Sequence, residues 1–244
     1  MRQDPRSETP PGPVAAWFRK VMCGRFANQV EGMGAWGDLL EDWPHDVPRG
    51  YNIAPTRTIP VWVHDHSTGG ARGLGMRWGL IPAWSKVPAP RFATFNARSE
   101  TLAEKPAFRQ AWKRSQTCLV PALGYYEWTG ERGNRQPYFI RTRNRDPLVM
   151  AGLWDYWQQG GRGIHSCTII TQPSEGPLRD LHARIPVMLE LNQAQAWLQD
   201  GIHRLNLIVK QPHTERLDFY PVSKAVNRTT SEGRNLIEKL EGTA

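Results

Sequence analysis

The sequence predicts an α+β fold dominated by antiparallel strands. Short segments rich in β-branched and aromatic residues recur along the chain, short turns separate them, and few helical patterns lie between them. The 244 residues are 39% hydrophobic and 22% charged, a composition that supports a substantial core. We expect a single domain over residues 22–244. It follows a proline-rich leader over residues 1–21 that we expect to be disordered, and absent or removed in the active protein.

The first half of this domain is predicted from periodicity and prolines. Apolar residues on one side of residues 32–43 indicate a short helix, although three glycines weaken the pattern. Alternation indicates a strand over 59–64, a turn follows over 67–70, and a strand over 74–80 ends at Pro82. A helical stretch after residue 98 is broken near Pro106, and residues 118–128 then read as one continuous strand.

The second half repeats the strand pattern with two helical interruptions. Branched and aromatic residues predict strands over 138–141, 148–154 and 166–171. Residues 178–183 have the pattern of one helical turn that ends at His182, and Asn192 is placed to cap a short helix through Gln199. Further strands are predicted over 205–209 and 217–222.

Charge and composition point to an anionic partner in a reducing compartment. The net charge is +8, and eleven tryptophans offer flat rings on which bases can stack, so nucleic acid is the first candidate and a basic surface without a specific partner the alternative. Three cysteines without paired spacing argue against a disulfide framework, and we expect a cytoplasmic, nucleoid-associated protein. No apolar run approaches the ~20 residues that span a membrane, and no zinc-ligand spacing occurs.

The dipeptide Met22-Cys23 has an unusual chemical potential. Cleavage between the two residues gives Cys23 a free α-amine beside its thiol. An aldehyde can form an imine with that amine, and the thiol can then add to the imine carbon and close a thiazolidine. Ordinary pKa values of roughly 7.7–8.0 for the amine and about 8.5 for the thiol put both near neutrality. Taken alone, the dipeptide is also an ordinary strand start.

Three further residues are candidates for chemistry, and each has a structural alternative. Glu127 lies among Tyr125, Tyr126 and Trp128, where loss of hydration favours the neutral acid and suits it to proton transfer; the alternative is an exposed strand residue. His182 can shuttle protons near neutral pH or be structural. The Asn96 amide can orient an amine or a carbonyl, or form a turn.

One stretch interleaves cationic and aromatic residues. Residues 77–84 run Arg-Trp-Gly-Leu-Ile-Pro-Ala-Trp, which suits a groove where phosphates meet arginine and bases stack on tryptophan. The alternative is a core strand with one exposed arginine.

Together these stretches resemble the SOS response-associated peptidase (SRAP) family, in the family's order from Met22 to about Asn227. The motifs that carry the resemblance are Met22-Cys23-Gly24-Arg25-Phe26, Tyr51-Asn52-Ile53-Ala54-Pro55-Thr56, Met76-Arg77-Trp78-Gly79-Leu80-Ile81-Pro82, Phe95-Asn96-Ala97-Arg98-Ser99-Glu100, Gly124-Tyr125-Tyr126-Glu127-Trp128, His182-Ala183-Arg184-Ile185-Pro186-Val187, and Pro221-Val222-Ser223 with Val226-Asn227.

The resemblance implies a curved, barrel-like, mostly antiparallel sheet with peripheral helices. It also implies a protein that senses abasic sites in single-stranded DNA, crosslinks to them through a Cys23 thiazolidine and shields them from cleavage and error-prone bypass. The implied enzyme is a thiol autopeptidase that exposes Cys23, with weak lyase activity, without metal or organic cofactor, monomeric and away from membranes. The implied catalytic residues are Cys23, Asn96, Glu127 and His182, and the implied DNA contacts are Arg25, Pro55, Arg77, Trp78 and Arg98.

Two other functions remain open from the sequence. Met-Cys-Gly also begins glutamine amidotransferases, which would use Cys23 to hydrolyse glutamine, and a glutaminase assay separates that class. A noncatalytic module for single-stranded DNA would bind in a salt-sensitive way without a covalent product. For the crosslinking function, an intact leader makes the Cys23 nitrogen an amide. Activity therefore requires either translation from Met22 or cleavage of the Met22–Cys23 bond by the domain itself.

Overall fold

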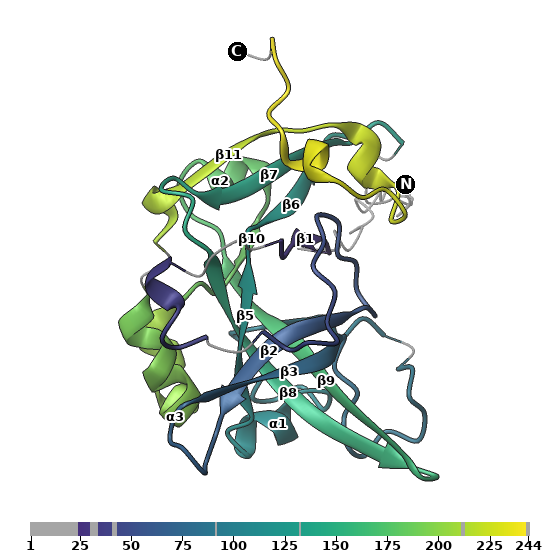
Figure 1. Ribbon diagram of the computed structural model, residues 1–244, viewed down its shortest axis with the longest axis vertical. Helices are drawn as coiled ribbons and strands as arrows, with labels where there is room; N and C mark the ends of the chain where they lie inside the picture. Colours follow the sequence, from purple (N-terminus) through teal and green to yellow (C-terminus); the bar gives the residue numbers. More distant parts are fainter. Residues whose placement is uncertain are drawn as a thin grey trace, which may run out of the picture.

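The computed structural model describes residues 24–29, 34–40, 43–90, 92–131, 133–210 and 213–242. The predicted leader and Cys23 lie outside the described residues. The described chain forms two sheets, a larger one below and a smaller one above in Figure 1. The strands are β1 (Phe26–Ala27), β2 (Thr58–His64), β3 (Ala71–Trp78), β4 (Asn96–Arg98), β5 (Thr117–Ala122), β6 (Gly124–Thr129), β7 (Gln136–Thr142), β8 (Leu148–Gln159), β9 (Arg162–Pro173), β10 (Arg184–Pro186) and β11 (Leu217–Pro221).

The larger sheet closes into a barrel. Its order is β10-β9-β3-β2-β5-β8, and β8 pairs back onto β9, so β9, β3, β2, β5 and β8 form a five-stranded ring. Most pairs are antiparallel, while β3 and β4 run parallel to β9. Two layers of side chains fill the space inside and around this ring, so the predicted α+β class with a curved, mostly antiparallel, barrel-like sheet is confirmed.

The smaller sheet has the order β1-β6-β7-β11 and lies above the barrel (Figure 1). The predicted single strand over 118–128 is wrong, because β5 belongs to the barrel and β6 to the smaller sheet. Gly124 explains the crossing: a Cβ there would come within 2.4 Å of the Phe139 ring and 2.5 Å of the Ile140 carbonyl oxygen. The absence of a side chain thus lets β6 lie close to β7.

Helices are short except for one. They are η1 (Gly34–Trp36), α1 (Arg109–Lys113), α2 (Leu178–Leu181), α3 (Leu191–Ile208), η2 (Thr214–Arg216), η3 (Lys224–Asn227) and η4 (Arg234–Ile237). The helix expected over 32–43 includes residues outside the described ranges, and η1 is its described helical part. The helical turn expected before His182 is confirmed as α2.

Helix α3 corrects two predictions. It extends to Ile208 and so covers most of the strand expected over 205–209, with a kink at Asp200. Its N-cap is Glu190, which forms a capping box with Gln193, rather than Asn192. The short segment 205–209, which contains four apolar residues, was predicted as a strand. The buried residues are Leu205 and Ile208, three apart, while Leu207 is 59% exposed, which is the spacing of a helix face on the barrel.

Candidate active site and nucleic-acid interface

The centre of the candidate site is a buried carboxylate and a buried histidine. Glu127 lies on β6 and His182 follows α2, and their side chains are each 4% exposed. Glu127 Oε1 lies 3.9 Å from His182 Nδ1, an ion-pair distance when the histidine is protonated. Two groups that can exchange protons are therefore held together away from bulk water, an arrangement suited to general acid–base chemistry.

The backbone of Arg184 orients the imidazole of His182. The Arg184 N–H donates to Nδ1 at 3.2 Å, and the Arg184 carbonyl oxygen lies 3.1 Å from the same nitrogen. The Arg184 side chain is fixed in turn by a two-pronged contact with Glu100 at 2.5 and 2.7 Å and by the Thr171 carbonyl at 2.7 Å. These hydrogen bonds from Arg184 hold the pKa of Glu100 below its usual value.

The residues at and just before the start of β1 lie beside β6, the strand that carries Glu127. Phe26 pairs with Tyr125 and Ala27 with Gly124, and the Tyr126 N–H donates to the Arg25 carbonyl at 3.0 Å. The same register, continued back by two residues from Phe26, sets Gly24 opposite Glu127. Gly24 is the first described residue and the one that follows Cys23.

Asn96 occupies the other edge of β9 from His182. It begins β4 and pairs with Ile169, whereas β10, which follows His182, pairs with the opposite edge of β9. The structure thus brings Glu127 and His182 together directly and links the Asn96 segment to them through β9. Asn96 is half-buried, so part of the residue is accessible to a ligand.

Trp78 does not have the position expected of a base-stacking residue. Its side chain is fully buried, and its ring packs edge-on against Phe26 at 5.0 Å and Phe95 at 5.8 Å between centroids. Its indole N–H donates to the Phe95 carbonyl at 2.9 Å. No face of the ring is open to a base, and the expected stacking is corrected to a core role. The three rings connect β1 with the residue before Asn96.

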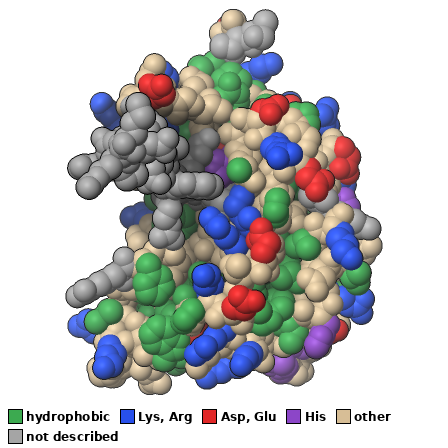
Figure 2. Space-filling view, turned by 180° about the vertical axis from the view of Figure 1, so that it is seen from behind, with side chains coloured by type: hydrophobic (Ala, Val, Ile, Leu, Met, Phe, Trp, Pro, Cys, Tyr) green, Lys and Arg blue, Asp and Glu red, His purple; other side chains and the backbone are tan. Residues whose placement is uncertain are grey.

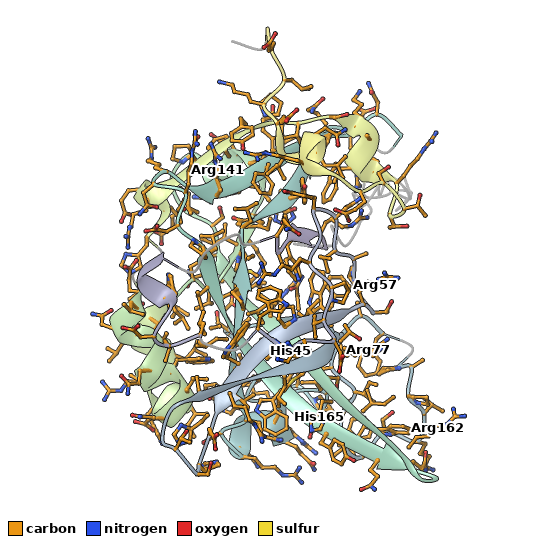
Figure 3. The ribbon with its side chains drawn as sticks, viewed as in Figure 1. His45, Arg57, Arg77, Arg141, Arg162 and His165 are labelled. Carbon is orange, nitrogen blue, oxygen red and sulfur yellow. The ribbon has the colours of Figure 1, made fainter. Side chains whose placement is uncertain are left out.

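The arginines expected to contact DNA differ in their solvent exposure and in their hydrogen bonds to the protein. Arg98 is exposed, and Arg77 is half-buried with a guanidinium that donates to the Gly79 carbonyl. Burial lowers the pKa of Arg77, which keeps its charge at neutral pH. Figure 3 shows Arg77 beside the exposed Arg57, which borders the half-buried Pro55 in the chain through Thr56.

Arg25 is also half-buried, and its guanidinium donates hydrogen bonds to protein acceptors. Nη1 donates to Asn52 Oδ1 at 2.7 Å and to the Val226 carbonyl at 2.9 Å. The guanidinium carbon lies 6.0 Å from the centroid of the Trp128 ring. Burial lowers the pKa of Arg25. The structure therefore places Arg25 in a network of protein contacts beside the start of β1.

An exposed aromatic residue missed as a site candidate lies at the end of the same basic stretch. Trp84 is 50% exposed, as are Val87 and Phe92 in the loop that follows. The start of this loop is held to β8, because the buried Asp155 accepts the Ala83 N–H at 2.9 Å. On the reverse face, Figure 2 shows exposed hydrophobic side chains with Lys and Arg side chains around them. Both tryptophans, at positions 78 and 84, belong to the same basic and aromatic stretch, with Pro82 between them. The sequence alone does not show which of the two is exposed.

The two described cysteines are not candidate nucleophiles. Cys118 and Cys167 are fully buried in the barrel, and burial raises the pKa of both thiols, which therefore stay protonated. The sequence contains three cysteines, so the remaining thiol is that of Cys23. Among the described residues no cluster of three or more His, Cys, Asp or Glu side chains is suited to hold a metal ion. Within the same residues no helix has the length and apolar character needed to cross a membrane.

Comparisons with known proteins agree on one family. The family model described as SOS response associated peptidase (SRAP) matches residues 22–229. The "Abasic site processing protein YoqW" of Bacillus subtilis (strain 168) is 34% identical over 232 residues, covering 89% of this chain and 99% of that protein. The "Abasic site processing protein HMCES" of Xenopus tropicalis is 33% identical, covering 85% of this chain and 75% of that protein.

Solved structures extend the likeness to the fold. A crystal structure of a protein from Bordetella bronchiseptica matches with a TM-score of 0.73 at 25% identity, over 82% of this chain and 100% of that one. A phage-related protein from the same organism matches with a TM-score of 0.62 at 29% identity, over 83% of this chain and 95% of that one.

Proposed function

Because the chain belongs to the SOS response associated peptidase (SRAP) family, we propose that it processes abasic sites in single-stranded DNA by crosslinking to them through Cys23. The names of the relatives support the substrate. The observation that carries the proposal is the register that sets Gly24 opposite Glu127, whose carboxylate lies 3.9 Å from His182. A nucleophile on the residue before Gly24 would thus react beside a buried pair of proton carriers.

The chemistry begins when the abasic sugar opens to its aldehyde, a proton transfer that we assign to His182. The Cys23 α-amine attacks C1′ and forms a carbinolamine, with the Asn96 amide orienting the amine. Glu127 then passes a proton to the departing hydroxyl, so that one water leaves and an imine remains. The Cys23 thiol adds to the imine carbon, its proton moves to the nitrogen, and the thiazolidine closes.

Ring closure explains how the product would protect the DNA. An open imine acidifies the C2′ proton and so promotes strand cleavage by elimination. Addition of the thiol converts the imine carbon to a saturated centre and removes that electron sink. Weak lyase activity is therefore expected only where the thiol step fails. No step requires a metal ion or an organic cofactor.

The free amine has to be generated before any crosslink forms. We infer that it arises either by translation from Met22 and loss of that methionine, or by cleavage of the Met22–Cys23 bond. In the second route the Cys23 thiol attacks the preceding carbonyl, Glu127 or His182 moves the proton, and water releases the leader. The peptidase and the crosslinking reaction would then use the same residues.

A denaturing gel tests the proposal. Protein that begins at residue 23 is mixed with a single-stranded oligonucleotide containing one abasic site, and with the same oligonucleotide containing an intact base. We expect a slow-migrating band that survives heat and detergent with the abasic strand only. Ammonia release from glutamine without such a band would favour the amidotransferase, and salt-sensitive binding without it would favour the noncatalytic module.

The exposed side chains that the structure describes between Trp84 and Arg98 mark the proposed path of the DNA. Trp84 and its apolar neighbours offer stacking faces, and Arg98 offers an exposed charge next to Asn96. We propose secondary contacts at Pro55 and Arg77, which are both half-buried. Binding of a single strand does not require a pocket for each nucleotide, because bases stack on exposed aromatic rings and phosphates contact cationic side chains.

Trp84→Ala and Trp78→Ala should have opposite consequences. Loss of the exposed ring should weaken single-strand binding by about 1–3 kcal/mol and leave folding unchanged. Loss of the buried ring should lower the free energy of unfolding by about 3–5 kcal/mol, because it empties a core position. Fluorescence anisotropy and urea unfolding measure the two effects. Equal DNA affinity in wild type and Trp84→Ala would remove Trp84 from the DNA path.

Arg98→Ala should reduce the salt dependence of binding. A lost phosphate contact on a single strand flattens the slope of log K against log salt by about 0.7. Arg162→Ala is a matched control, because Arg162 is an equally exposed arginine that Figure 3 shows at the far end of β9. A slope that changes as much in the control as in Arg98→Ala would mean that only net charge matters.

A further inference from the structure

The first described strand, β1, begins three residues after Cys23 in the chain and is very short. The Phe26 N–H donates to the Ile53 carbonyl at 3.2 Å, and the Phe26 carbonyl accepts from the Ile53 N–H at 2.8 Å. The Tyr126 N–H, on β6, donates to the Arg25 carbonyl. Strands in globular proteins usually have about 3–10 residues, so a strand of this length supplies few main-chain hydrogen bonds to the N-terminal segment. The side chain of Arg25, two residues after Cys23, adds further hydrogen bonds that anchor the residues before β1.

The acceptors of Arg25 come from two distant parts of the chain. One is the side-chain oxygen of Asn52, and the other is the Val226 carbonyl in η3. Trp128, over which the guanidinium lies, donates its indole N–H to Asn227 Oδ1 at 2.7 Å, also in η3. The start of the described chain is thus joined to the segment that follows β11.

Asn52 is the residue common to these contacts. It is 5% exposed, its oxygen accepts from Arg25 at 2.7 Å, and its Nδ2 donates to the Arg228 and Ser231 carbonyls at 2.9 and 2.8 Å. One buried amide therefore uses both its acceptor and its donor sides, and each side holds a different segment. A side chain of another type at this position would leave buried polar groups without partners.

We propose that Asn52 is a positioning residue for Cys23, because it locks Arg25, which directly precedes β1, to the main chain of residues 226–231. This inference rests on the proposed crosslinking function and assigns it a further residue. It also assigns Arg25 to anchoring rather than to a phosphate. Bond formation between two bound groups depends steeply on their placement, so loss of the anchor should slow the reaction without removing any reacting atom.

Asn52→Ala tests the proposal against a matched control. Asn28→Ala removes another buried asparagine whose side chain holds the same loop, since Asn28 Oδ1 accepts the Gly50 N–H at 2.7 Å, but it leaves the contacts of Arg25 in place. Crosslinking is measured in single turnover over a range of abasic-oligonucleotide concentrations. We expect Asn52→Ala to lower the rate at saturating DNA by about 100-fold, with half-saturation unchanged, and Asn28→Ala to lower neither.

The double variant sharpens the test. If Arg25 and Asn52 act through one contact, Arg25→Ala with Asn52→Ala should be no slower than the slower single variant. Effects that multiply would show that the two residues act separately. A raised half-saturation concentration and a flatter salt slope in Arg25→Ala, with an unchanged maximal rate, would return Arg25 to the DNA interface and overturn the anchoring role.

Hydrogen exchange decides the inference independently of the reaction. We expect Asn52→Ala to lose protection at Phe26 and at Val226, Arg228 and Ser231 together, whereas Asn28→Ala retains it at 226–231. Loss at one segment alone would contradict a lock between them. If wild-type protein forms no crosslink, the proposed function fails, and joint loss of protection would then establish the lock without the role in catalysis; separate loss would overturn both.

Discussion

Cys23→Ala, in protein that begins at residue 23, should lose the stable crosslink to abasic DNA and still form an imine. Alanine keeps the α-amine, which attacks the aldehyde, but it has no thiol to close the ring. The imine should be trapped by borohydride, and without reduction it should hydrolyse or lead to some strand cleavage. Denaturing gels with and without borohydride measure both products.

The buried thiols provide the control for that experiment. Cys118 and Cys167 lie fully buried in the barrel, and Cys118→Ala and Cys167→Ala should crosslink as wild type does once the folded fraction is accounted for. A heat-stable, unreduced crosslink in Cys23→Ala would rule out the thiazolidine, because no other group on that residue can stabilise the imine.

Glu127→Gln should slow crosslinking by about 10²-fold or more at saturating DNA, which is the usual contribution of a positioned acid–base group. Glutamine has nearly the same shape and fills the same buried position, but it cannot donate or accept a proton at neutral pH. In a chain that carries the leader, release of residues 1–22 should slow as well, because the same carboxylate is proposed to move the proton there.

Glu131→Gln is the matched control, since Glu131 is an exposed glutamate just beyond β6. It undergoes the same chemical change without touching His182. Single-turnover rates with a saturating abasic oligonucleotide, and thermal unfolding of both variants, separate catalysis from stability. Wild-type rates in a folded Glu127→Gln variant would remove Glu127 from the mechanism.

The fold class and most strands of the barrel were predictable, because alternation marks residues 59–64 and branched and aromatic residues mark 148–154 and 166–171. The division of residues 118–128 between two sheets was not, because it depends on the contact of Gly124 with Phe139 and Ile140, which are distant in sequence. The short apolar segment 205–209 was misread for a similar reason. An apolar segment of this length fits a strand or part of a helix, and the burial of Leu205 and Ile208 with Leu207 exposed identifies the helix.

The candidate site was predictable in its residue types and less so in its contacts. Glu127 was expected in an aromatic setting, but its proximity to His182 depends on the packing of α2 against β6. The sequence offered two tryptophans, and only burial distinguishes Trp78 from the exposed Trp84. Asn52 belonged to a quoted motif, yet its contacts with Arg25 and residues 226–231 join three parts of the chain that no local pattern relates.

The requirement for a free α-amine on Cys23 is tested most directly by intact mass. Protein expressed from the full 244-residue chain is reacted with an abasic oligonucleotide, and the crosslinked species is weighed and its N-terminus mapped by digestion. We predict that every crosslinked molecule begins at Cys23 and has the summed mass of protein and DNA less one water. A crosslinked population that still carries residues 1–22 would contradict the N-terminal amine mechanism.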